Sequence, residues 1–495
     1  MPQAPARPGL VIAALASAGI ASAFTQTMVT PLVALLPGIF STTSDNTAWV
    51  FTATLLAAAV AVPISGRLGD LFGKRRMLLA LALPLAVGAV VCAIAPNVQV
   101  MILGRALQGL GSGMVPLGIA LLRDVVPKER LSSAIATVSA TLGAGGAIGL
   151  PVSAAVIEFS SWRVLFWAAA VVSGLIALTI WRLVPAVPAG AAGQRFDGVG
   201  AVGLAAGLVA LILGISKGSA WGWTSPLTIG LLAAAAVVLG LWGWWELRTP
   251  DPLIDLRTTA QPRVLLTNVA SIFVGFGMYA SSLVFPQVLQ LSAETGYGLG
   301  QSILAAGLWM APAGLMMLVL SPVGGRMSDA RGSKFTFLVG VVVLAAGYGV
   351  ALLAMSHAWG ILLAGLVVNS GVAFAYGAMP AIIMGAVPRS ETAAANGFNT
   401  LMRSLGTTTG SAVVGIVLAQ MTVPLHGVAV PSEAGFHTVL AIGAGVALVA
   451  AVIVAFIPAA RTVVLAESSV DAAAPAPSPL EGRPGEPELV GARER

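Results

Sequence analysis

The feature that most constrains the fold of this chain is a succession of long uncharged apolar runs. Because an α-helix rises 1.5 Å per residue, about 20 mainly apolar residues cross the hydrocarbon core of a bilayer. Only 9% of the 495 residues are charged, too few to cover a soluble protein of this size. We therefore expect an all-α membrane protein. Dividing the uncharged runs at loop signals predicts fourteen transmembrane helices, at 10–36, 47–66, 77–96, 98–122, 132–157, 164–184, 198–216, 225–245, 264–291, 300–324, 335–356, 359–387, 393–421 and 437–458.

The positions of lysine and arginine predict how these runs are oriented. If the amino terminus is cytoplasmic, eighteen Lys and Arg residues fall in inner loops and only Arg163 and Lys217 fall in outer loops. Cytoplasmic loops carry such an excess, so both termini are expected in the cytoplasm. Heavy use of Ala and Gly hints at a GC-rich bacterium, which makes the bacterial inner membrane the expected location. The segment ASA at 21–23 could mark a signal-peptidase site, but the uncharged stretch continues to Asp45, which favours a spanning helix.

The two halves of the chain repeat each other at offsets of 259 to 263 residues. GRLGDLFGKRR at 66–76 recurs as GRMSDARGSKF at 325–335, Val126-Pro127 recurs as Val387-Pro388, and a Leu-Gly pair at 142 recurs at 405. The first six runs end at residue 184, so this offset leaves room for an inserted helix pair. The expected organisation is a cytoplasmic segment at 1–9, a six-helix bundle at 10–184, a linker with the extra pair at 185–263, a second six-helix bundle at 264–458 and a disordered cytoplasmic tail at 459–495.

Three motifs carry a resemblance to a known family. The loop after the second run has its pattern at Gly66, Gly69, Asp70, Gly73, Lys74, Arg75 and Arg76, and LGRALQGLGSG has it at Arg105, Gln108 and Gly109. GAGGAIGLPVSAAVIEFSSWRVLF is a degenerate third motif, with Gly149-Leu150 where the family has Gly-Pro and Ser153-Ala154 where it has a glycine pair. Over residues 10–460 the chain resembles the major facilitator superfamily, and specifically its fourteen-helix drug:proton antiporter family.

This resemblance implies two six-helix bundles with an inserted hairpin, and a multidrug exporter that works by alternating access. The implied partners are a small-molecule substrate, protons and the lipid bilayer, with the proton gradient as energy source and a monomer as the working unit. No enzyme activity, cofactor, metal or nucleic acid is expected, since the three His and the single Cys92 form no ligand-like cluster. An uncoupled facilitator, or a lipid or metabolite translocator on the same scaffold, is the alternative.

The charged residues near the motifs are candidates for coupling and conformational control. Asp70 and Arg75 hold the loop in the cytoplasm, and the resemblance implies that such contacts keep the cytoplasmic side closed. Arg105, with Gln108, lies roughly 10 Å into the fourth span, where an ion is a functional candidate by default. The alternative for Arg105 is a structural bond to free carbonyls of the first helix. The residues expected to pack or bend helices are Gly66, Gly73, Gly109, Gly145, Gly149 and Pro151.

A second intramembrane cation, Arg403, lies near the midplane. Asn396, Asn399 and Arg403 are spaced three and four residues apart and share one helix face, which predicts either a cavity wall or a helix–helix hydrogen-bond network. For the remaining candidates, ordinary packing is the alternative to a role in the cavity. They are Thr25, Gln26, Thr30, Tyr279, Gln287, Trp309 and Asn369.

No acidic residue falls in the interior of a predicted span. The family usually has an aspartate in the first helix where this chain has Thr25. A lipophilic cation would enter a low-dielectric cavity with two arginines and no counter-charge, so the cargo is expected to be neutral or anionic. The best remaining proton sites are Glu158, at the outer end of the fifth span, and Asp124, at the inner end of the fourth.

Overall fold

The computed structural model describes residues 8–32 and 35–458 of the chain. Most of the expected N-terminal segment at 1–9 and the expected tail at 459–495 lie outside the described residues, as do Arg7 and Arg461. Within the described part, fourteen helical segments are long and apolar enough to cross a membrane. The all-α fold with fourteen membrane helices, predicted from the sequence, is confirmed.

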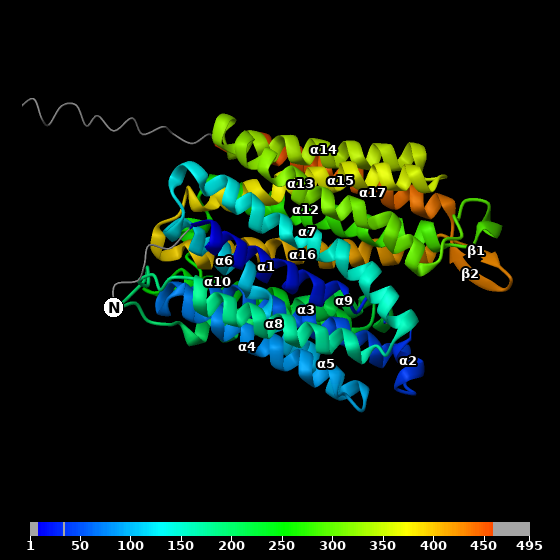
Figure 1. Cartoon of the computed structure of the whole chain (residues 1–495), viewed down its shortest axis with the longest axis horizontal. Coiled ribbons are helices and arrows are strands. Elements are labelled where there is room, and N and C mark those ends of the chain that lie inside the picture. Colours follow the sequence, from blue (N-terminus) through cyan, green and yellow to red (C-terminus); the bar gives the residue numbers. More distant parts are fainter. Residues whose placement is uncertain (1–7, 33–34, 459–495) are drawn as a thin grey trace, which may run out of the picture. The chain divides into compact units, whose positions relative to one another are not determined.

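Twelve of these segments form two bundles of six, and the other two form a hairpin inserted between them in sequence (Figure 1). The fourth segment consists of two helices joined by a short 3-10 turn, η1 (Gly111–Gly113). The first bundle contains α1 (Pro8–Thr27), α3 (Ser44–Phe72), α4 (Lys74–Ala93), α5 (Val98–Leu110), α6 (Met114–Val125), α7 (Lys128–Phe159) and α8 (Arg163–Leu183). The inserted hairpin contains α9 (Gly198–Trp221) and α10 (Pro226–Glu246). The second bundle contains α12 (Pro262–Gln290), α13 (Ile303–Arg331), α14 (Ser333–Ala354), α15 (Ala358–Met384), α16 (Thr392–Gln420) and α17 (Glu433–Ala455).

Several helix ends differ from those expected. α1 ends at Thr27, and a short helix α2 (Leu36–Ile39) follows, because Pro31 and Pro37 lack the amide hydrogen that a continuous helix needs. α9 continues to Trp221 and so includes Lys217, which was expected in an outer loop. Lys217 is buried, and its ammonium group lies 4.9 Å from the ring centre of Trp49 on α3, a contact that offsets part of the cost of burying the charge.

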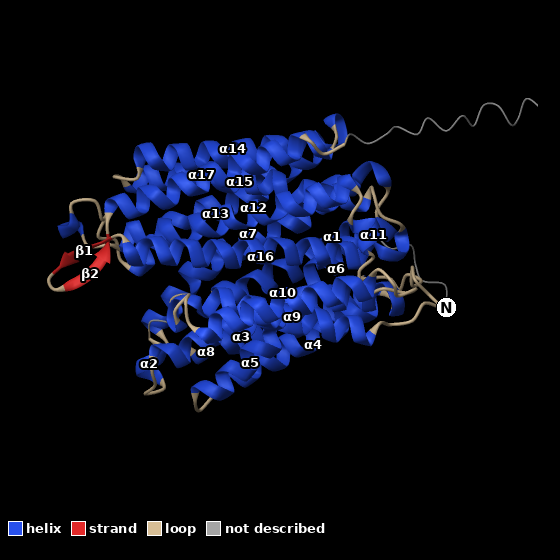
Figure 2. Ribbon diagram, turned by 180° about the vertical axis from the view of Figure 1, so that it is seen from behind, coloured by secondary structure: helices blue, strands red, loops and turns tan. Residues whose placement is uncertain are grey.

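A β-hairpin between α16 and α17 was not expected from the sequence. Its strands are β1 (Thr422–Leu425) and β2 (Val428–Pro431), paired antiparallel with Leu425 opposite Val428. The two turn residues, His426 and Gly427, have φ of 49° and 81°. Positive φ at both central residues is what a tight two-residue hairpin turn requires. The hairpin lies at one end of the long helices in both views (Figures 1 and 2).

The bundles meet mainly where α3 packs against α16 and α7 against α13; α7 also packs against α15, and α6 against α16. Helix α9 of the inserted hairpin packs against both α3 and α16, so it covers the first of these contacts. An apolar cluster joins the three helices through Ala59 of α3, Leu204 and Leu208 of α9, and Leu401 of α16. The extra helix pair is therefore bound to both bundles.

The repeated motif makes the same backbone turn in both bundles. Gly73 separates α3 from α4 with φ of 98°, and Gly332 separates α13 from α14 with φ of 86°. These conformations are open to glycine and strained for residues with a Cβ. Glycine at the eighth position of each copy is therefore explained by the turn itself.

We expect Gly73→Ala and Gly332→Ala each to lower the free energy of unfolding by about 1–2 kcal/mol, because each forces alanine into a left-handed conformation. Thermal unfolding of the detergent-solubilised protein would measure the change. Gly349→Ala in α14 is the matched control, since no heavy atom lies within 4 Å of the added Cβ and its φ is negative. Equal effects at all three positions would contradict the role assigned to the turns.

Candidate functional site

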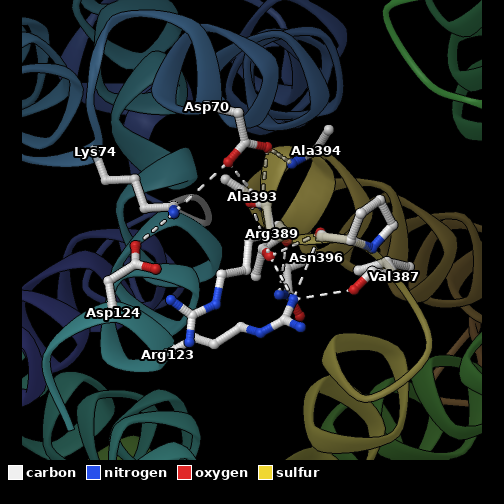
Figure 3. A network of polar contacts seen from close by, with 11 residues as sticks. Asp70, Lys74, Arg123, Asp124, Val387, Arg389, Ala393, Ala394 and Asn396 are labelled. Atoms are coloured by element: carbon white, nitrogen blue, oxygen red, sulfur yellow. Dashed lines mark hydrogen bonds and ion pairs between the residues drawn. The ribbon is translucent and has the colours of Figure 1, made fainter. Parts of the chain in front are cut away.

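The contact between α3 and α16 contains a buried carboxylate that joins the two bundles. This contact lies at the end of the helices where α3 turns into α4, which we call the basic end; the opposite end, with β1 and β2, is the hairpin end. Asp70 accepts hydrogen bonds from the backbone N–H of Ala393, at 3.0 and 3.2 Å, and of Ala394, at 2.9 Å (Figure 3). Its side chain is fully buried. Asp70 thus binds the free N–H groups and the positive dipole at the start of α16.

Lys74 supports this carboxylate from the first bundle. Its ammonium group lies 3.7 Å from Asp70 and 2.6 Å from Asp124 at the end of α6. Lys74 is buried together with Asp70, so the pair is poorly screened by water. Asp124 was one of the two proton sites predicted from the sequence. In the structure its carboxylate accepts a hydrogen bond from Lys74 (Figure 3).

Arg123 forms a second polar connection between the bundles. Its guanidinium donates to the carbonyl oxygen of Val387 at 3.1 Å and to Thr392 Oγ1 at 2.7 Å, both at the start of α16 and the loop before it. Arg123 was not among the residues predicted to be functional. Its position in the repeat was the available signal, because Arg123 lies three residues before the Val-Pro pair of the first half. In the structure it contacts the Val-Pro pair of the second half.

Close approach of the two backbones makes these bonds possible. A Cβ at Gly66 would lie 2.5 Å from the carbonyl oxygen of Ala393, and one at Gly397 would lie 2.9 Å from that of Val62. Both distances are too short for a real side chain, so the contact needs glycine on each helix. We call Asp70, Lys74, Arg123 and the start of α16 the latch.

The second copy of the motif also brings two helices of different bundles together, but its aspartate forms no polar link between them among the described residues. Gly325 on α13 faces the backbone of Ser133 on α7, with 2.5 Å from a Cβ to the Ser133 Cα, as Gly66 faces Ala393. Asp329, however, is exposed and makes no hydrogen bond or ion pair with the described residues. Arg75 is also outside the latch, since it donates to the carbonyl oxygen of Trp181 at the end of α8 in its own bundle.

Arg105 is held by the first helix. Its Nη1 donates to the carbonyl oxygen of Thr25 at 2.8 Å and to Gln108 Oε1 at 2.7 Å, and the residue is 1% exposed. The hydroxyl of Thr25 bonds to Ala21 in its own helix, and the residue is buried between helices rather than lining open space. Arg105 therefore makes the bond to a carbonyl of the first helix that its structural alternative expects, and its role in coupling stays a prediction.

Among the described residues, Arg403 has an aromatic neighbour and no ion-pair partner. Its guanidinium carbon lies 4.5 Å from the ring centre of Tyr376 on α15, and Nη2 donates to Thr400. On the same face, Asn399 donates to Asn268 and Ser271 of α12, at 3.0 and 2.7 Å. Asn396 bonds to the carbonyl of Thr392 in its own helix. At Asn399, the polar stripe predicted on α16 is therefore part of a hydrogen-bond network between α12 and α16, which was one of the two alternatives.

A model of the Major Facilitator Superfamily matches residues 15–199, 193–410 and 267–484. The chain belongs to the major facilitator superfamily. The Multidrug resistance protein B homolog of Mycobacterium tuberculosis is 32% identical to it over 317 residues, which are 63% of this chain and 57% of that protein. This chain thus spans less than two thirds of that relative's length.

Two further proteins place this superfamily member among its relatives. The Tetracenomycin C resistance and export protein of Streptomyces glaucescens is 28% identical over 380 residues, covering 75% of this chain and 68% of that protein. The crystal structure of the human organic anion transporter TETRAN has a TM-score of 0.62 at 14% identity, covering 91% of this chain and all of the other. The second likeness concerns the fold alone.

The other candidate residues of this superfamily member are dispersed. Gln26 is exposed on α1, Thr30 is exposed in the turn that follows it, and Tyr279 is half-buried on α12. Gln287, exposed on the same helix, lines a groove near the hairpin end. Trp309 packs edge-on against Trp359, which is 72% exposed, so this pair lies at the helix surface. Asn369 donates to Gly365 in its own helix, and Glu158 is exposed at the end of α7.

Most of the residues predicted to pack or bend helices lie at close contacts between helices, some within one bundle and some between the two. A Cβ at Gly109 would lie 2.5 Å from the Thr54 carbonyl oxygen, and one at Gly145 would lie 2.5 Å from that of Ile20. Gly149 faces the side-chain hydroxyl of Thr27 on α1. Pro151 lies against Gly307 of α13 in the other bundle.

We expect Asp70→Asn to loosen the latch of this superfamily member, because a charge-assisted bond to a helix N-terminus is worth about 1.5–3 kcal/mol. Spin labels on cysteines replacing Phe72, the last residue of α3, and Ser390, just before α16, would report the distance between the bundles. The population with a separated basic end should rise about tenfold or more. Asp329→Asn is the control and should leave the distances unchanged; an equal response in both variants would contradict the latch.

Proposed function

We propose that this chain exports amphipathic organic molecules from a bacterial cell by alternating access between its two bundles. The observation that carries the proposal is the latch, in which a carboxylate of one bundle binds the helix start of the other. Such a contact is strong enough to hold one end closed and consists of few bonds, so it can break as a unit. The names of the relatives, which include multidrug resistance and an antibiotic export protein, support drug-like cargo.

The direction of export depends on the basic end facing the cytoplasm. Lys74, Arg75, Arg76 and Arg123 all lie at this end, as the excess of basic residues in inner loops predicts. In that orientation the latched conformation is closed toward the cytoplasm. Cargo would leave toward the outside in this conformation and enter after the latch opens.

Cysteine labelling would test this orientation. Cys92 is fully buried, so a membrane-impermeant maleimide should report only cysteines that are added. We expect Ser356→Cys, exposed in the loop between α14 and α15 at the hairpin end, to react in intact cells. Ala192→Cys, exposed in the segment between α8 and α9 at the basic end, should react only after permeabilisation. The reverse pattern would refute the proposed orientation.

The buried charges favour neutral or anionic cargo. Arg105 and Arg403 are buried in the spans, whereas no Asp or Glu of the described residues lies in the middle of a helix. Desolvating a dication beside such groups costs several kcal/mol without a compensating partner. Cargo whose negative or polar groups can approach Arg403 from a wet cavity avoids this cost.

We expect an amphipathic anion to compete for binding at least about tenfold better than a permanently dicationic dye of similar size, which corresponds to about 1.4 kcal/mol. Competition binding to the purified protein would measure this difference. Growth of a pump-deficient host across neutral, anionic and cationic toxins would extend it to cells. Tight binding of the dication would overturn the proposed cargo class.

Proton entry is the energy source we propose, with an uncoupled facilitator or lipid-type translocator as the second candidate. The absence of a mid-depth acid among the described residues favours the second candidate. A pH jump applied to cargo-loaded vesicles separates them: a coupled exporter accumulates cargo against its gradient, whereas a facilitator only equilibrates it. Glu158 stays a predicted proton site, and Asp124 a less favourable one because Lys74 holds it.

A further inference from the structure

Two buried acids lie together at the basic end of the inserted hairpin, outside both six-helix bundles. Asp197, at the start of α9, is 8% exposed, and Glu246, at the end of α10, is 2% exposed. A Cβ added at Gly200 would lie 2.6 Å from Glu246 Oε1 and would also contact Asp197 Oδ2. The two carboxyl groups therefore flank the same glycine.

The two acids differ in their hydrogen bonds. Asp197 has a partner for each oxygen, since it accepts from the N–H of Gly200 at 2.8 Å and from the indole N–H of Trp245 at 2.9 Å. Neither oxygen of Glu246 has a well-aligned hydrogen bond among the described residues, although the backbone N–H groups of Leu253 and Ile254 face it. The indole N–H of Trp242 faces Glu246 and is itself buried without a partner.

No basic side chain of the described residues neutralises this pair. Neither acid forms an ion pair, and Asp197 is the one charged group that acts on Glu246. The nearby cations point elsewhere: Arg248 lies over the ring of Trp244, and Arg257 donates to the carbonyl of Leu247. The other charged groups at this end of the surrounding elements also make no hydrogen bond to the pair; they are Arg67 and Asp70 on α3, Arg195, Asp251 and Asp255 in the flanking segments, and Glu391 before α16.

Two adjacent carboxylates cannot both stay ionised in such a site, because burial and like charge both disfavour the second negative charge. We propose that Asp197 and Glu246 form a proton-binding carboxyl pair, in which the proton resides on Glu246 and its O–H donates toward the Asp197 carboxylate. Proton release leaves a dianionic pair, and proton binding restores the single negative charge. The ligand of this site is thus a proton, taken up from the side that the basic end faces.

The position of this pair links it to both bundles. Leu253 and Ile254, whose backbone N–H groups face Glu246, are buried in the apolar cluster that joins Ala59 of α3 to Leu401 of α16. A change of charge on Glu246 therefore acts on the segment that holds the hairpin against the bundle contact. That this proton takes part in transport rests on the proposed function; that it binds here does not.

Infrared difference spectroscopy of the full-length protein in liposomes tests the site directly. We expect the C=O stretch of a protonated carboxyl group at neutral pH, lost on alkaline titration and absent in Glu246→Gln. Asp197→Asn removes the adjacent charge, so the titration of that band should move to lower pH by about one unit or more. Asp251→Asn, in the neighbouring segment, should leave the band unchanged.

An identical carboxyl band in wild type and Glu246→Gln would overturn the proposal, as would its absence from wild type throughout the titration. If the glutamine variant folds poorly, the shift of the band to lower pH in Asp197→Asn decides the matter, and a band that does not move there overturns the proposal. Cargo-evoked proton uptake by vesicles then addresses the proposed function separately. If wild-type vesicles show no such uptake, the exporter is uncoupled, and the infrared band still decides whether the pair binds a proton.

Discussion

The structure depends on the cost of leaving polar groups without partners in hydrocarbon. Helices satisfy the backbone internally, and hydroxyls such as Thr54 and Ser271 bond to carbonyls one turn earlier. Charged groups are few and are confined to helix ends or held by specific partners, as Arg105 is by Thr25. A charge that is buried in this structure therefore depends on its specific partners, and removing a partner is costly.

Close backbone contact is the second condition for this architecture. Between bundles, Gly66 and Gly397 bring α3 against α16, and Gly325 brings α13 against α7. Glycine pairs of this kind replace the hydrophobic effect, which is weak between helices that are already surrounded by lipid. The two contacts share one geometry, but only the first carries a buried carboxylate. This asymmetry distinguishes the α3–α16 contact from its counterpart between α7 and α13.

The inserted hairpin is more than an addition to a twelve-helix fold. Helix α9 lies on the same bundle contact that the latch closes, and the segment after α10 returns to that contact through Leu253 and Ile254. Glu246 at its base faces Leu253 and Ile254, which belong to the apolar cluster that joins both halves. A charge change there is well placed to influence the bundle contact, even though the hairpin lies outside the six-helix repeats.

The sequence alone determined the helical class, the number of membrane segments, the repeat and the superfamily, because each depends on local hydrophobicity or on short motifs. It missed the hairpin at 422–431, where uncharged residues form strands because His426 and Gly427 make a tight turn. Only the tertiary structure decided which groups meet: Asp70 and Ala393 lie 323 residues apart, and Asp197 meets Glu246 from the other helix of the hairpin. Such partners depend on how helices are placed in three dimensions, and periodicity along one helix carries no record of that placement.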